Sequence, residues 1–206
     1  MDDSIEKLAR ETKAFMRFLS KQFKAPSGHF HTTAAKLQNS VLSIILFIIL
    51  TAIALYRLSL EPGVPALQLV SYFSIFFLLL FVINIIANIS TARLFSEPET
   101  LSELTRKLGG FYAIPIALSF ASFLLTFTQS YPLASILLSI SLIIAFILIP
   151  LFTITLILIH HQKSIDGFHG ILFYLSMTVV GGILLIVFFE DTPIRIVLRF
   201  LTFHYS

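Results

Sequence analysis

Two asparagines, Asn84 and Asn88, lie four residues apart inside a long apolar stretch of the chain. This spacing places both amides on one face of a helix. An amide surrounded by hydrocarbon needs hydrogen-bond partners, because a polar group isolated there costs several kcal/mol. Two interpretations follow: hydrogen bonds between helices, or part of a polar path for a transported molecule. No Asp, Glu, Lys or Arg accompanies the amides within residues 66–92, which favours hydrogen bonding.

Three histidines and one aspartate flank another junction between apolar stretches. His160 and His161 end one stretch, His169 begins the next, and Asp166 lies between them. Imidazole and carboxylate groups can bind a divalent metal. However, neighbouring positions of a helix point about 100° apart, so His160 and His161 do not face one ion from the same helix. Polar groups at a membrane boundary explain the three histidines equally well. We therefore predict no metal site and no cofactor. If a metal were bound, these three histidines would be the candidate ligands.

The usual catalytic patterns are missing. The chain has no Cys, which excludes thiol catalysis and thiolate metal sites. It also lacks a GxSxG turn, an HExxH helix and a glycine-rich phosphate loop. The adjacent acids Glu190 and Asp191 end an apolar stretch, where solvation accounts for them. We therefore predict no enzymatic activity and no catalytic residue.

The elements that carry these residues are apolar helices. The chain has 206 residues, of which 57% are hydrophobic and 12% charged, with a mean hydropathy of +0.94. Soluble domains carry about 25% charged residues, so a water-soluble globule is excluded. A membrane-spanning helix needs about 20 apolar residues, and one charge at its centre costs roughly 2.5–3.5 kcal/mol. The predicted fold is an all-α, polytopic transmembrane bundle over residues 29–189. Its five charge-free spans are residues 38–56, 66–92, 110–127, 133–159 and 170–189.

The basic residues predict the orientation of the bundle. Most of them precede the first span or lie in the connections on the N-terminal side of the membrane, whereas Arg57, Arg195 and Arg199 fall on the other side. Positive loops stay in the cytoplasm. We predict a multi-pass protein of a bacterial cytoplasmic membrane, with the N-terminus inside and the C-terminus outside. Because residues 1–36 contain no apolar segment, the first span is expected to act as an uncleaved insertion signal.

The first domain, residues 1–28, begins with a predicted amphipathic helix over residues 1–24. Apolar residues recur there at spacings of three and four, and most basic residues lie off that stripe. Three interpretations stay open: a helix in the headgroup layer of an anionic leaflet, a cap on the bundle, or a docking face for a partner. Nucleic acid is excluded, because acids alternate with the bases. The predicted membrane-surface residues are Lys7, Lys13, Phe15, Arg17, Leu19, Lys21, Phe23 and Lys24.

Small residues and prolines within the spans predict close packing, local bending or the lining of a polar path. Two shorter helices are also expected outside the spans. One runs from Ser96 or Glu97, as its cap, to about Leu108. The other is an interfacial helix within residues 190–206, opened by Asp191-Thr192-Pro193. The packing or path candidates, beside the two asparagines, are Gly110, Pro115, Pro150, Gly181 and Gly182.

The layout resembles a known family. A basic N-terminus, five spans and a short outer tail are similar to the Yip family, the Rab-interacting Golgi membrane proteins and their bacterial relatives. The local match is Leu108-Gly109-Gly110-Phe111-Tyr112-Ala113-Ile114-Pro115, which enters the third span. The Asp-Leu-Tyr-Gly-Pro signature of the eukaryotic members is missing, so the chain looks like a bacterial-type member. The resemblance implies the architecture and assigns no catalytic residue.

These features predict a non-enzymatic membrane protein that acts as a scaffold or regulator of membrane partners. The expected partners are anionic lipids at the cytoplasmic face, together with another membrane protein or further copies of the chain. The alternative is a small transporter or channel component, with a polar path near Asn84 and Asn88.

Overall fold

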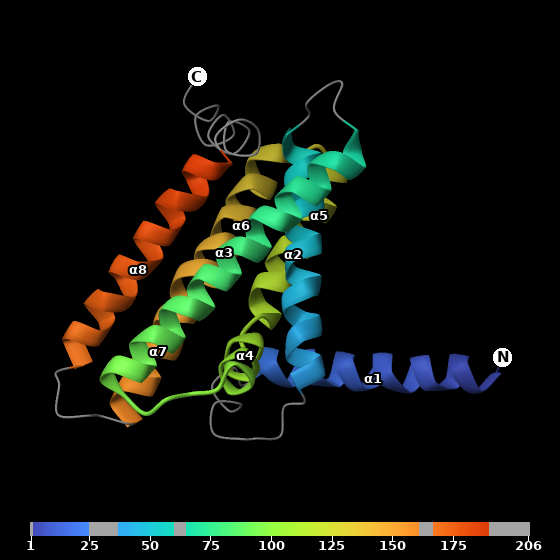
Figure 1. Cartoon of the computed structure of the whole chain (residues 1–206). Coiled ribbons are helices and arrows are strands. Elements are labelled where there is room, and N and C mark those ends of the chain that lie inside the picture. Colours follow the sequence, from blue (N-terminus) through green and yellow to red (C-terminus); the bar gives the residue numbers. More distant parts are fainter. Residues whose placement is uncertain (1, 25–36, 60–64, 161–166, 190–206) are drawn as a thin grey trace.

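The computed structural model describes residues 2–24, 37–59, 65–160 and 167–189, and these residues fold almost entirely into helices (Figure 1). The predicted all-α class is confirmed, with no strand in the described part of the chain. The helices are α1 (Asp2–Lys24), α2 (Leu37–Ser59), α3 (Ala66–Phe95), α4 (Leu101–Gly109), α5 (Ala113–Phe127), α6 (Tyr131–Ile143), α7 (Ile149–His160) and α8 (Gly167–Phe188), and a π-helical turn η2 (Ile144–Leu148) joins α6 to α7.

Four stretches of the described chain are each long and apolar enough to cross a membrane: α2, α3, α8 and the continuous run 131–159. A fifth crossing is added if α4 and α5, which meet at a bend of 51°, count as one broken span, because only the pair together passes the same criteria. The predicted polytopic membrane bundle is therefore confirmed. Helix α3 has 30 residues, more than a bilayer requires, and it runs obliquely beside α2 (Figure 1).

Helix α5 has only 15 residues, yet together with the end of α4 it contacts α2 near both ends of α2. Gly109, just before α5, lies against Ser40 near the start of α2. At the opposite end, the Arg57 guanidinium lies 5.0 Å from the centre of the Phe127 ring. The predicted third span began at residue 110, but residues 110–112 form a turn. Pro115 then lies in the first turn of α5, where its missing N–H costs nothing, so it does not kink the span.

Helix α4 begins later than the sequence suggested. The predicted cap at Ser96 or Glu97 is wrong, because the N-cap is Thr100, which forms a capping box with Glu103. The Glu103 backbone N–H donates to Thr100 Oγ1 (3.3 Å), and the Thr100 N–H donates to Glu103 Oε2 (3.0 Å). The N–H and hydroxyl of Thr100 hold the pKa of Glu103 below its usual value. Ser96 instead donates to the Ile157 carbonyl of α7 (3.3 Å), which joins the end of α3 to α7.

An aromatic cluster forms the centre of the bundle. The Phe47 ring of α2 lies 5.2 Å from Tyr112 and 5.8 Å from Phe146, measured between ring centres. Phe77 and Phe81 of α3 contact Phe146 and Tyr112, respectively. Tyr112 directly precedes α5 and Phe146 lies within η2, so this cluster ties the turn before α5 to the middle of the fourth span.

Candidate functional site

Helix α1 lies across one end of the bundle, with its N-terminal half projecting beyond the spans (Figure 1). It contacts the bundle through Phe18, which is 7% exposed, and through the fully buried Gln22. The Gln22 amide donates to the Gly109 carbonyl (3.4 Å), which anchors α1 to the turn before α5. Helix α1 is thus fixed to the bundle near its C-terminal end.

The bundle covers only one edge of the predicted apolar stripe of α1. Phe15 and Leu19 are half-buried, whereas Phe23, predicted on the same stripe, is 59% exposed, and Met16 is 60% exposed. The difference arises because the contact runs through Phe18 and Gln22, at one edge of the stripe. Part of the apolar face of α1 is therefore not covered by the described bundle.

The charges of α1 are divided along its length. The first half carries Asp2, Asp3, Glu6 and Glu11 among its bases, and Glu6 forms an exposed ion pair with Arg10 (3.6 Å). From residue 12 onward the helix contains no acid. Its basic residues in that half are all exposed and lie beside the bundle: Lys13, Arg17, Lys21 and Lys24.

The turn between α4 and α5 connects α1 to α2. A Cβ added at Gly109 would lie 2.5 Å from the Ser40 Cβ and 2.7 Å from the Ser40 backbone. The Ser40 hydroxyl donates to the Arg106 carbonyl (3.3 Å), which fixes the same contact. The candidate Gly110 is buried, but it has ordinary helical dihedrals (φ −62°, ψ −22°). The structure thus places the close helix approach at Gly109, the neighbour of the predicted glycine.

Tyr112 reaches from this turn to the π-helical turn η2. There the Ile149 N–H bonds to the Ile144 carbonyl, five residues back, so the Ala145 carbonyl loses its α-helical donor. The next donor in sequence would be Pro150, which has no N–H. The buried Tyr112 hydroxyl donates to this Ala145 carbonyl instead (3.3 Å). Pro150 therefore follows a π-helical turn and does not simply kink an α-helix. Such turns are frequent at functional sites.

A row of buried hydroxyls holds α5 between α2 and α6. Thr51 and Ser119 are 2.9 Å apart, Ser119 and Ser141 are 2.8 Å apart, and Ser141 donates to the Pro115 carbonyl (2.8 Å). Ser122 also donates across the interface, to the Ala134 carbonyl (2.7 Å). This row was not predicted from the sequence. Its signal was the recurrence of hydroxyl residues every three or four positions in the third span: Ser119, Ser122 and Thr126.

Asn84 and Asn88 lie at the contact of α3 with neighbouring helices, and both are buried. The Tyr174 hydroxyl of α8 donates to Asn84 Oδ1 (2.7 Å), a bond between two spans. Asn88 donates to the Asn84 carbonyl (2.9 Å), and its Oδ1 has no hydrogen-bond partner among the described residues. The structure thus brings Asn84 into an interhelical bond with Tyr174, a partner that the sequence analysis did not identify.

The remaining candidates are dispersed. A Cβ at Gly181 would lie 2.5 Å from Ile83 Cγ2, so this glycine lets α8 approach α3, whereas Gly182 has nothing within 4 Å. His169 is exposed in α8, and His160 ends α7. His161, Asp166 and the predicted helix within residues 190–206 lie outside the described residues. Within the described residues no group of three or more His, Cys, Asp or Glu is placed to hold a metal ion.

Comparison of the chain with protein-family models, with curated proteins and with solved structures gives no match.

Proposed function

We propose that the protein is a non-enzymatic membrane scaffold or regulator whose working surface is α1 on the anionic cytoplasmic leaflet. The observation that carries this proposal is the position of α1 across the ends of the spans, with part of its apolar face uncovered. The purely basic second half of α1 lies beside the bundle, at the level where lipid headgroups surround the spans. Lipid is favoured over a protein partner because basic and apolar faces side by side match the headgroup layer.

The orientation is part of the same proposal. The contacts of Gln22 with Gly109, and of Ser40 with Arg106, place α1 and α4 at one end of the bundle. That end collects the basic residues of both helices, including Arg106 and Lys107, and basic ends stay in the cytoplasm. The N-terminus is therefore inside. The resemblance to bacterial Yip-type proteins supports the bacterial cytoplasmic membrane as the location.

Single-cysteine labelling tests this orientation, because the native chain has no Cys. Ser130→Cys, between α5 and α6, should react with a membrane-impermeant maleimide in intact cells. Ser102→Cys in α4 and Ser4→Cys in α1 should react only after permeabilisation. Reaction of Ser4→Cys in intact cells would show that the orientation is opposite and that α1 does not lie on the cytoplasmic leaflet.

A tryptophan reporter tests the lipid contact of α1, because the chain contains no Trp. In the full-length protein in lipid nanodiscs, Phe23→Trp should emit at shorter wavelength in anionic than in neutral bilayers. Replacing Lys13, Arg17, Lys21 and Lys24 by Gln should abolish this difference. Each basic residue near an anionic surface contributes about 1 kcal/mol, so the four together favour binding by up to about 10³-fold.

The matched control replaces Lys7 and Arg10 by Gln in the acid-containing half of α1. This variant should keep most of the difference in Trp emission wavelength between anionic and neutral bilayers. High salt should weaken the anionic effect, since it screens exposed charges. Identical emission in neutral and anionic bilayers would refute the proposal of an anionic-lipid surface.

A further inference from the structure

The fourth span can adopt two backbone registers at η2. In the observed π register the Ile149 N–H bonds to the carbonyl five residues back, and the Ala145 carbonyl accepts from the Tyr112 hydroxyl (3.3 Å). In an α register the Ile149 N–H would serve the Ala145 carbonyl. The Phe146 carbonyl would then lack a donor, because Pro150 has no N–H. Each register leaves one carbonyl to a donor outside the span, so the bonds of the span alone do not decide between them.

The position of Tyr112 favours the π register. Its buried hydroxyl supplies the donor that the Ala145 carbonyl needs only in that register. The backbone of Tyr112 belongs to the turn before α5, where its N–H donates to the Gly109 carbonyl (3.4 Å). A movement of this turn therefore moves the hydroxyl relative to Ala145.

The Gly109 carbonyl is also the point at which α1 is attached. Gln22 Nε2 donates to it over 3.4 Å, the same distance as the Tyr112 N–H. Both bonds are longer than the usual range of about 2.7–3.2 Å, as expected when two donors share one oxygen. Without Gln22 the oxygen is left to the Tyr112 N–H alone, and the turn can tighten around it.

The attachment of α1 is weak enough to be reversible. Gln22 is fully buried, yet its Oε1 has no hydrogen-bond partner among the described residues. A buried acceptor without a partner disfavours the attached position. The contact of α2 with α4, in which Ser40 donates to the Arg106 carbonyl, does not involve α1. Helix α1 can therefore leave Gly109 while this contact persists.

We propose that α1 and η2 form a two-state relay through the turn 109–112. Attachment of α1 to Gly109 keeps the Tyr112 hydroxyl on Ala145 and the fourth span in its π register. Release of α1 returns the span to the α register, which turns α7 by about 100° relative to α6. A relay needs such an element with two discrete states, because spatial proximity alone does not couple two sites.

The composition of α7 permits this rotation. Apart from two threonines that donate to carbonyls of the preceding turn, α7 is apolar on every side before His160. Hydrocarbon can therefore surround either orientation. The stimulus for release rests on the proposed function: anionic lipid bound to the basic residues beside Gln22 holds α1 in place, and a neutral leaflet does not.

Selective NMR labelling tests the relay in the full-length protein. The dipeptide Ala-Phe occurs twice in the chain, at Ala14-Phe15 in α1 and at Ala145-Phe146 in η2. Protein with ¹³C in its alanine carbonyls and ¹⁵N in its phenylalanines therefore gives two signals in a carbonyl–nitrogen correlation. The protein is placed in nanodiscs that contain phosphatidylglycerol. Tyr112→Phe identifies the Ala145 signal, because it removes the donor to that carbonyl.

Gln22→Ala should move the Ala145 signal in the same direction as Tyr112→Phe. Gln22→Asn, whose amide is one methylene shorter, should do the same while it keeps a polar side chain. In the Pro150→Ala background the Ala145 carbonyl has a backbone donor in either register, so Gln22→Ala should no longer move the signal. A purely local role of Gln22 would leave the Ala145 signal in place in both backgrounds.

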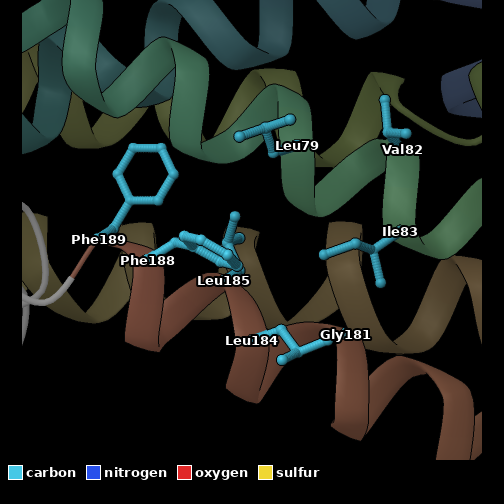
Figure 2. Close-up of a pocket in the computed structure, with 8 residues that line it drawn as sticks. All are labelled: Leu79, Val82, Ile83, Gly181, Leu184, Leu185, Phe188 and Phe189. Carbon is cyan, nitrogen blue, oxygen red and sulfur yellow. The ribbon is translucent and has the colours of Figure 1, made fainter.

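Two controls separate the relay from a general loosening of the bundle. Ser20→Ala changes an exposed residue of α1. Gly181→Ala places a methyl group 2.5 Å from Ile83 Cγ2, at the contact of α8 with α3 (Figure 2). Neither should move the Ala145 signal. Movement by Gly181→Ala as large as that by Gln22→Ala, or no movement by either Gln22 variant, would overturn the relay.

A change of lipid separates the relay from the proposed function. Replacing phosphatidylglycerol by phosphatidylcholine should move the Ala145 signal in the same direction as Gln22→Ala. A signal that responds to Gln22→Ala but not to lipid charge would support the relay and contradict the anionic-lipid surface of α1.

Discussion

Gly109→Ala should destabilise the folded bundle by about 3 kcal/mol or more, measured as the free energy of unfolding in an SDS titration. The new methyl group would lie 2.5 Å from the Ser40 Cβ and 2.7 Å from the Ser40 Cα and carbonyl oxygen. Overpacking typically costs about 1–3 kcal/mol, and it costs most where backbone must move. Here α2 and α4 would have to separate. That separation would also strain the Gln22 contact that anchors α1.

The chain supplies its own controls for this substitution. Gly182→Ala meets nothing within 4 Å, so it should be neutral or stabilise by up to about 1 kcal/mol, the helix-propensity gain of alanine over glycine. For Gly181→Ala the three nearest atoms all belong to the Ile83 side chain and none to the backbone, so its effect should fall between the two. Equal effects at Gly109 and Gly182 would contradict the close approach of α2 and α4.

The glycine pairs show what the sequence can and cannot predict. The absence of charge over long stretches predicted the spans directly, because a buried charge is so costly in hydrocarbon. Adjacent residues of a helix, however, point about 100° apart. Nothing in the sequence says whether Gly109 or Gly110, or Gly181 or Gly182, faces a neighbouring helix, since that depends on how each helix is rotated in the bundle.

The polar contacts were hidden for a related reason. Asn84 was identified because an amide is unusual in a span, but its partner Tyr174 lies 90 residues away in the chain. The cap of α4 was misplaced because Ser96 and Thr100 both suit an N-cap, and only the bond of Ser96 to Ile157 in α7 decides between them. In each case the deciding partner belongs to another helix, so the local sequence pattern does not reveal it.

The Tyr112 hydroxyl has a role that a double-mutant cycle can isolate. Tyr112→Phe keeps the ring in the aromatic cluster but leaves the Ala145 carbonyl without a donor, so it should cost about 1–2 kcal/mol of unfolding free energy. Tyr112→Ala also removes the ring and should cost about 3–5 kcal/mol. Tyr72→Phe, at a 38% exposed position of α3, is the matched control and should have little effect.

Pro150→Ala restores a backbone N–H five residues after Ala145, where the π register places a donor for that carbonyl. If η2 reverts to α-helical bonding, Ile149 supplies the donor instead. Either way the Ala145 carbonyl gains a backbone partner, so Tyr112→Phe should cost much less in the Pro150→Ala background than in the native chain. Additive effects of the two substitutions would show that Tyr112 does not replace the missing proline donor, since independent sites add. The turn before α5 would then be linked to the fourth span through aromatic contacts, among them that of Phe111 with Phe152.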